Sequence, residues 1–258
     1  MLERSRGFPQ LMLPKVAADG RAARIAYAAP APPASNLPRI ALLLAGFGQS
    51  ARDSGTASET LPGPVGFAVS TYAGNPAPLI EAARARGHEL FASIPMEPQG
   101  YPLNDEGTRS LRTGLTPEEN QTNLEWALGQ VQGAVGATGA SDGMRGERFA
   151  ELSAAFDPVL DEIGRRGLLY LDPRPGRPAA RPGTRAVDLV LDEPPARAEI
   201  EAKLASLERI ARDRGSAIGL IGPPRPVTLE RIASWARGLQ ARGILLVPIS
   251  SLIETAHE

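Results

Sequence analysis

The stretch that decides the fold of this chain is RIALLLAGFG, residues 39–48. It is apolar almost throughout between Pro38 and a glycine turn, which is the pattern of a strand buried on both faces of a sheet. In α/β proteins, the carboxyl end of such a strand is where ligands bind and chemistry takes place. Here that end carries Ala45 and Gly46, so it offers no carboxylate, imidazole or thiol.

Beyond this stretch, short apolar runs alternate with helical patterns along the chain. Such alternation predicts an α/β protein in which βα units surround a mostly parallel sheet. Strands are expected at 39–45, 65–70, 89–94, 134–137, 168–171, 187–191, 216–221 and 244–248. Helices are expected near 50–60, 77–86, 117–130, 150–166, 199–213 and 227–241.

Several helix ends carry recognisable signals. Thr116 is expected to cap a helix that begins at Pro117, because a threonine N-cap and a proline in the first turn are both favoured there. Gly215 supplies a C-terminal stop for the helix before it. Basic residues such as Arg165 and Arg166 occupy the last turn of a helix, where they favour the negative end of its dipole, so a structural role is expected for them.

The composition excludes several classes of function. The 258 residues fit one large α/β domain or two small ones. The formal charge is −1, which gives no field that would attract nucleic acid. There are no cysteines, so disulfides, thiolate metal sites and cysteine nucleophiles are excluded, while both the cytoplasm and the periplasm stay open as locations. The two histidines are His88 and His257.

The first 38 residues differ in character from the rest. No run approaches the roughly 20 apolar residues that a membrane span needs, and residues 1–9 are charged with no apolar segment after them, so neither a membrane span nor a signal peptide is expected in this chain. The segment 28–38, AAPAPPASNLP, is typical of a proline-rich linker. We therefore expect an N-terminal arm and linker at 1–38, followed by a domain at 39–258.

Several phrases of the sequence resemble one family. They are LPGPVGFAVSTYA (61–73), RGHELFASIPMEPQGYPLNDEG (86–107), LTPEENQTNLEWAL (115–128), RRGLLYLD (165–172) and RGSAIGLIGPPRPVTLE (214–230). The family is that of the divergent polysaccharide deacetylases, distant relatives of metal-dependent enzymes that remove N- or O-acetyl groups from cell-envelope glycans. The resemblance implies an irregular (β/α) barrel of about seven parallel strands, with a ligand groove at the carboxyl ends of the strands.

The metal-binding positions of those enzymes carry other residues here. Ala45 and Gly46 match a pair of aspartates, and Ser93 and Ala140 match two histidines that follow the third and fourth strands. A late phrase that holds further histidines in relatives reads GPPRP, residues 222–226. Zinc hydrolysis needs imidazole and carboxylate ligands and a carboxylate that activates water. The resemblance therefore predicts a degenerate member whose zinc site is lost and which uses no metal or other cofactor.

Polar side chains at the expected strand ends still point to a groove. The groove candidates are Tyr72, Glu97, Tyr101, Asp105, Ser141, Asp142, Asp172, Arg174 and Arg225. Carboxylates with arginines between them bind sugar hydroxyls or acyl groups through charge-assisted hydrogen bonds, and tyrosines stack on sugar rings. Asp172–Arg174 and Glu97–Arg225 are equally compatible with plain ion pairs that close the end of the barrel.

Two further residues are expected to be structural. His88 lies at the turn that enters the third strand, on the face of a barrel opposite to the usual active site, so its imidazole is expected to bond nearby backbone. Tyr170 falls inside a strand and is expected to pack in the core.

Three functions are compatible with these features. The leading hypothesis is a deacetylase-like domain without zinc-dependent catalysis that binds an acetylated or peptidoglycan-type glycan, or an envelope protein. The alternative is an active carbohydrate deacetylase with a histidine-free site, in which Glu97 or Asp172 acts as general base. A third is an envelope scaffold. The resemblance implies a periplasmic or cell-envelope location for all three.

Overall fold

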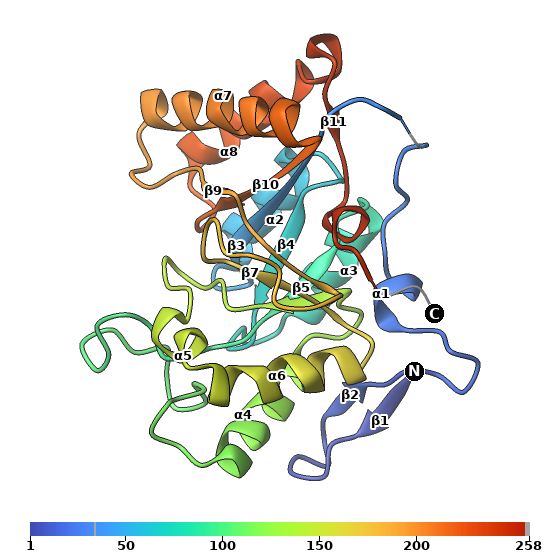
Figure 1. Cartoon of the computed structure of the whole chain (residues 1–258), viewed down its shortest axis with the longest axis vertical. Coiled ribbons are helices and arrows are strands. Elements are labelled where there is room, and N and C mark those ends of the chain that lie inside the picture. Colours follow the sequence, from blue (N-terminus) through green and yellow to red (C-terminus); the bar gives the residue numbers. More distant parts are fainter. Residues whose placement is uncertain (34, 256–258) are drawn as a thin grey trace.

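The computed structural model describes residues 1–33 and 35–255, and in this part of the chain nine strands form one sheet with helices around it (Figure 1). The strands are β3 (Arg39–Phe47), β4 (Gly66–Ser70), β5 (Leu90–Ser93), β6 (Gly136–Thr138), β7 (Leu169–Asp172), β8 (Thr184–Ala186), β9 (Leu189–Val190), β10 (Ser216–Ile221) and β11 (Leu245–Leu246). Their order is β8-β7-β6-β5-β4-β3-β10-β9, with β11 paired to β3, and the recorded pairs are parallel.

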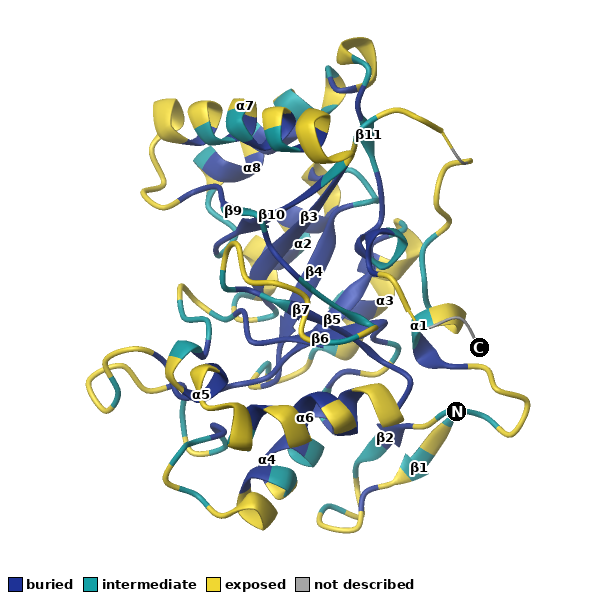
Figure 2. Ribbon diagram, viewed as in Figure 1, coloured by how far each residue is buried: buried dark blue, intermediate teal, exposed yellow. Residues whose placement is uncertain are grey.

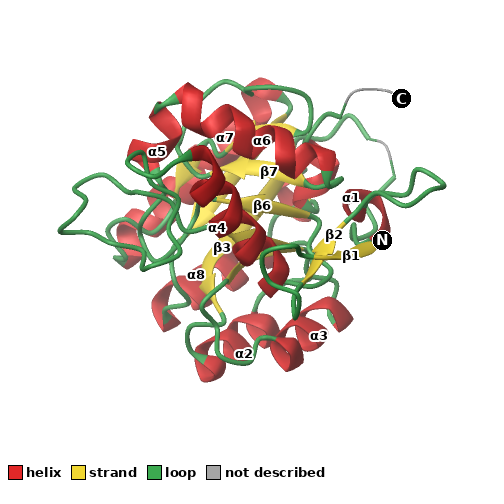
Figure 3. Cartoon of the chain, turned by 90° about the horizontal axis from the view of Figure 1, so that it is seen from below, coloured by secondary structure: helices red, strands yellow, loops and turns green. Residues whose placement is uncertain are grey.

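The helices lie on the outside of the strands (Figure 3). They are α2 (Ala51–Thr60), α3 (Ala77–Ala85), α4 (Pro117–Gln130), α5 (Glu147–Glu151), α6 (Ser153–Arg165), α7 (Arg197–Arg214) and α8 (Pro226–Arg237). Two predicted helix ends are confirmed. The Thr116 hydroxyl accepts from the Glu119 N–H while the Glu119 carboxylate accepts from the Thr116 N–H, and α7 stops at Gly215, whose φ is +80°.

Strand β3 is buried on both faces, as its apolar run predicts (Figure 2). Its side chains alternate between two apolar clusters. Leu42 and Leu44 belong to the cluster between the strands and the helices, whereas Leu43 and Ala45 belong to the cluster inside the curled sheet. Position 45 therefore faces the barrel interior at the carboxyl end of β3.

The sheet closes through one extended segment, residues 184–190. Its first part, β8, pairs with β7, and its second part, β9, pairs with β10. Between them, the Val187 N–H donates to the Asp172 carbonyl, and the Asp188 N–H donates to the Ile218 carbonyl. The irregular parallel (β/α) barrel expected from the sequence is thereby confirmed. The short strand β8 was not among the expected strands, because Thr184 and Arg185 break the apolar pattern.

The N-terminal arm is more ordered than its composition suggests. It forms an antiparallel hairpin of β1 (Leu2–Arg4) and β2 (Met12–Pro14), and a short helix, α1 (Ala23–Ala26), follows. The hairpin lies beside α4 and α6, and Leu13 is buried against the domain. An N-terminal hairpin was not among the expected elements.

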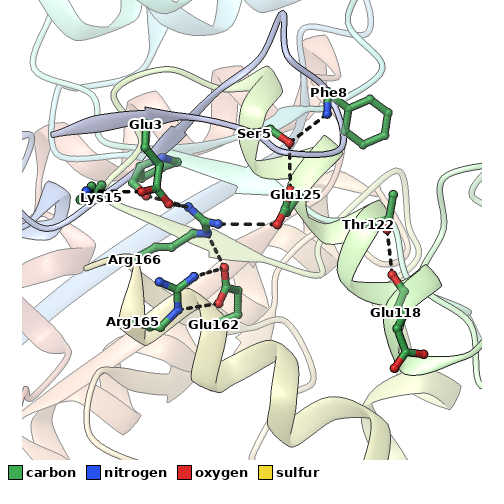
Figure 4. A network of polar contacts seen from close by, with 11 residues as sticks. Glu3, Ser5, Phe8, Lys15, Glu118, Thr122, Glu125, Glu162, Arg165 and Arg166 are labelled. Carbon is green, nitrogen blue, oxygen red and sulfur yellow. Dashed lines mark hydrogen bonds and ion pairs between the residues drawn. The ribbon is translucent and has the colours of Figure 1, made fainter.

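One buried arginine joins the hairpin to both helices (Figure 4). The Arg166 guanidinium donates to the Glu3 carboxylate at 3.2 Å, to the Pro14 carbonyl at 3.1 Å and to the Glu162 carboxylate at 2.6 Å. A second link runs from the Ser5 hydroxyl to Glu125 on α4, at 2.8 Å. The structural role expected for Arg166 is confirmed. Besides lying at the C-terminal end of a helix, its side chain connects that helix to the N-terminal hairpin.

His88 and Tyr170 are structural, as expected. The His88 ring is buried, with its two nitrogens 2.8 Å and 3.2 Å from the carbonyl oxygens of Val65 and Ser58. Burial lowers the pKa of this imidazole, so it stays neutral at pH 7. Tyr170 is 2% exposed and packs edge to face against Phe156 of α6.

A cleft at the carboxyl ends of the strands

A cleft of about 520 Å³ lies at the carboxyl ends of β3, β4 and β5 and beside the loop after β6. It is lined by Gly48, Gln49, Ser70, Thr71, Tyr72, Ala73, Gly74, Ser93, Pro95, Asp105, Glu106, Gly107, Ser141, Asp142 and Met144. Cavities of about 500 and 560 Å³ lie elsewhere, beside α1 and beside α8. Volume alone therefore does not select a site, but only this one of the three lies at the end of the barrel where ligands of such folds bind.

The residues that the sequence resemblance matched to metal ligands are packed into the barrel. Ala45 and Ala140 are 2% and 0% exposed and belong to the same internal cluster, and the Ser93 hydroxyl donates to the Ala140 carbonyl. Gly46 has a φ of +71°, a conformation that favours glycine.

The residues present do not fit a zinc ion. Among the described residues, no group of three or more His, Asp or Glu side chains could hold a metal, and the chain has no cysteine. His88 lies at the other end of the barrel, and His257 lies outside the described residues. A zinc site needs three or four such ligands. No step of a reaction is therefore derived through a metal.

Four of the sequence candidates meet at this cleft: Tyr72, Asp105, Ser141 and Asp142. Tyr72 is 46% exposed, its ring packs against Trp126 at 5.0 Å between centroids, and its hydroxyl accepts from the Arg109 N–H at 3.0 Å. One face of the cleft is thus an aromatic ring whose position is fixed by α4 and by the loop after β5.

The long loop between β5 and α4 is organised by Arg112. Its guanidinium donates to the Tyr101 hydroxyl at 3.1 Å and to the Gly107 carbonyl at 2.9 Å. It also pairs with Asp105 at 3.6 Å. The sequence interpretation did not name Arg112, because an isolated arginine in a polar loop gives no signal of what it will bind.

Glu97 and Tyr101 lie at a neighbouring cavity of about 420 Å³. Both oxygens of the Glu97 carboxylate are engaged, one by the Thr113 N–H and hydroxyl at 2.7 Å and the other by Arg148 at 3.0 Å. This carboxylate ties the loop to α5. The ion pair with Arg225 that was considered from the sequence is wrong, because the partner of Glu97 is Arg148.

The other charged candidates form local pairs. Asp172 and Arg174 make the expected ion pair, with 2.6 Å between their closest atoms. Arg225 pairs with Asp192 at 3.5 Å, and the fully buried Asp192 carboxylate also accepts from the Gly222 N–H and the Thr228 hydroxyl. None of these residues lines the cleft. Asp192 was missed because a single acid after an apolar run does not reveal its burial.

Glu106 is the principal residue of the cleft that sequence reasoning missed. The residue is 7% exposed; one carboxyl oxygen accepts from the Met96 N–H at 3.3 Å, and the other, Oε1, has no hydrogen-bond partner among the described residues. Burial is the main cause that raises the pKa of this carboxyl to about 8, and the nearby charges of Glu147 and Asp105 act in the same direction. The acid pair Asp105-Glu106 was visible, but which member turns inward was not.

Replacing Gly107 by alanine is expected to lower the free energy of unfolding by about 2 kcal/mol. Gly107 has a φ of +97°, and a β-carbon there would lie 2.9 Å from the Tyr72 hydroxyl. The matched control is Gly143→Ala, where φ is +76° and no atom lies within 4 Å, so only backbone strain of about 1 kcal/mol is expected. Urea unfolding of both variants checks this; equal losses would contradict the close contact with Tyr72.

The sequence and the fold were compared with known proteins. The family model described as "divergent polysaccharide deacetylase" matches residues 42–253. No curated protein matches the sequence significantly. An uncharacterized protein from Agrobacterium tumefaciens C58, ATU2773, has a similar structure, with 30% identity, a TM-score of 0.86, and coverage of 94% of this chain and 100% of that one.

More distant structures share the fold. A putative cellobiose-phosphate cleavage protein from Enterococcus faecalis gives a TM-score of 0.56 at 14% identity, with 84% of this chain and 99% of that one covered. A family 4 carbohydrate esterase from Streptomyces lividans, in complex with acetate, gives 0.52 at 13% identity, with 86% and 98% covered. Since the family model spans most of the sequence, this chain belongs to the divergent polysaccharide deacetylase family.

Proposed function

We propose that this domain binds an acetylated glycan in the cleft at the strand ends and does not carry out zinc-dependent hydrolysis. The main support for this proposal is the set of side chains that line the cleft. Its walls present serine and threonine hydroxyls, carboxyl groups and the exposed ring of Tyr72, and no lysine or arginine is among the residues that line it. Hydroxyl groups and one fixed aromatic face suit a neutral sugar.

The degenerate positions support the same proposal. The barrel of the family is kept here. By sequence resemblance, Ala45, Gly46, Ser93 and Ala140 match the metal-binding positions of relatives that hydrolyse acetyl groups. A pocket built for a sugar can keep its binding role when the groups that activate water are replaced, since binding and bond cleavage depend on different contacts.

An active deacetylase with a histidine-free site is less well supported. The two carboxylates considered as general bases are Glu97 and Asp172. Glu97 is held by Thr113 and Arg148, and Asp172 by Arg174. A general base must reach the proton that it abstracts, and neither carboxylate lines the cleft.

The proposal includes a location in the cell envelope, where acetylated polymers of this kind are found. Family membership supports this location. Among the described residues, no helix combines the length and the apolar character that a membrane crossing requires. Fractionation of cells that express the tagged full-length protein checks the location.

The binding proposal is tested by calorimetric titration with a tetramer of N-acetylglucosamine and with an O-acetylated peptidoglycan fragment. Tyr72→Ala is expected to weaken binding about tenfold, because it removes the aromatic face. Leu103→Ala is the control, since Leu103 is 95% exposed on the loop between β5 and α4 and does not line the cleft. Absence of saturable binding of both ligands, or equal weakening in both variants, would overturn the proposal.

A further inference from the structure

Glu106 lines the cleft, and no cationic side chain of the described residues forms an ion pair with its carboxyl group. The acids Asp105 and Glu147 act on it electrostatically, and its own charge acts on the phenols of Tyr72 and Tyr170. The two terminal nitrogens of Arg112 contact Asp105, the Tyr101 hydroxyl and the Gly107 carbonyl, while its Nε has no partner among the described residues.

The guanidinium of Arg145 pairs with Glu147 and Glu193, while its buried Nε has no hydrogen-bond partner among the described residues. A carboxyl group that is 7% exposed and faces other acids is more stable with its proton than without it. The raised pKa agrees with this geometry.

Two buried polar side-chain atoms of the cleft have no hydrogen-bond partner in the part of the chain that the structure describes. They are Oε1 of Glu106 and Oγ1 of Thr71, and the residues that carry them are 7% and 3% exposed. Both residues line the cleft. Buried polar groups in native proteins are rarely left without a partner, and those that are call for an explanation such as a ligand. A ligand that offers hydroxyl or amide groups here would satisfy both atoms.

We propose that Glu106 acts in its neutral form as a hydrogen-bond donor to the ligand and thereby selects uncharged, hydroxyl- or acetamido-bearing sugars for this cleft. This inference rests on the proposed function and names the residue that sets its ligand class. Loss of the proton places a negative charge beside Asp105 and removes the donor, so the affinity for a neutral sugar falls. An anionic sugar is disfavoured near neutral pH, because the acids Asp105 and Asp142 also line the cleft.

The test is the affinity for the N-acetylglucosamine tetramer between about pH 6.5 and pH 9.5, a range that brackets the pKa of Glu106. In the wild-type protein, affinity is expected to fall at least tenfold over this range. In Glu106→Gln, which keeps a donor and cannot ionise, it is expected to change less than about twofold. Burial raises the pKa of Tyr72 and lowers that of His88, so the titration of neither residue explains a change in affinity in this pH range.

A control variant and a second measurement show whether Glu106 itself causes the pH dependence of binding. Glu89→Gln alters another buried carboxyl, which accepts a hydrogen bond from the Ser250 N–H and lies outside the cleft. The affinity of this variant is expected to depend on pH as that of the wild-type protein does. A ¹³C titration of glutamate carboxyls gives a second readout that needs no ligand: one signal with a midpoint near 8 is expected, absent from Glu106→Gln.

A midpoint below about 6, or the same pH profile in wild-type protein and Glu106→Gln, would overturn the role of Glu106. Absence of binding by every variant at every pH would instead overturn the proposed function, while the carboxyl titration would still decide the state of Glu106.

Discussion

Replacing Glu106 by glutamine is expected to raise the free energy of unfolding by roughly 3 to 5 kcal/mol at pH 9 and to change it little at pH 4. The pKa of the folded-state carboxyl is about 8, above the ordinary value of 4.5. Below pH 4.5 the group is neutral in both states and costs nothing through ionisation. Between 4.5 and 8 the folded state keeps a proton that the unfolded state releases, so the stability of the wild-type protein is lost as the pH rises through this window.

The measurement is urea unfolding of the wild-type protein and Glu106→Gln at several pH values, compared as a difference so that other titrating groups cancel. Asp105→Asn is the matched control: it changes the adjacent acid, whose side chain is 44% exposed, and a difference below about 1 kcal/mol is expected at each pH. A stability difference between wild type and Glu106→Gln that did not vary with pH would contradict the buried, neutral carboxyl.

Replacing Arg166 by methionine is expected to lower the free energy of unfolding by about 3 kcal/mol and to expose the N-terminal hairpin to trypsin. Methionine keeps much of the apolar volume but removes the guanidinium, whose side chain is 4% exposed and which contacts Glu3, Glu162 and the Pro14 carbonyl. Carboxylates that are left partly buried without this partner account for most of the loss.

The control for this variant is the preceding residue. Arg165 also pairs with Glu162, but its side chain is 62% exposed, so Arg165→Met is expected to cost less than about 1 kcal/mol and to leave the hairpin protected. Cleavage within residues 1–27 is followed by mass spectrometry alongside the unfolding curves. Equal losses for the two variants would show that the buried network does not hold the hairpin in place.

The fold was predictable because its strands are carried by short apolar runs, and RIALLLAGFG alone indicates a buried parallel strand. The N-terminal hairpin was not, because each of its strands has only three residues. Its order comes from Arg166, more than 150 residues away along the chain from its partner in β2. A pairing over that distance leaves no local pattern to read.

Part of the candidate site was predictable because it follows from the predicted strands. Tyr72 and Ser141 follow strands directly, so the ends of those strands place them at the cleft. The acids of the long loop are different, because the path of that loop is fixed by Arg112 and by its contacts with Tyr101 and Gly107. Sequence reasoning therefore favoured Glu97, which supports the loop, and overlooked Glu106, which lines the cleft.

One titration tests whether the cleft binds an acetylated glycan without a metal. Metal-free protein is titrated with the N-acetylglucosamine tetramer in the presence of a chelator, and again with added zinc, while acetate release is followed in the same samples. If the cleft binds the glycan without a metal, saturable binding is expected that neither the chelator nor zinc changes, with no acetate released. One zinc per chain together with acetate release that the chelator abolishes would contradict it.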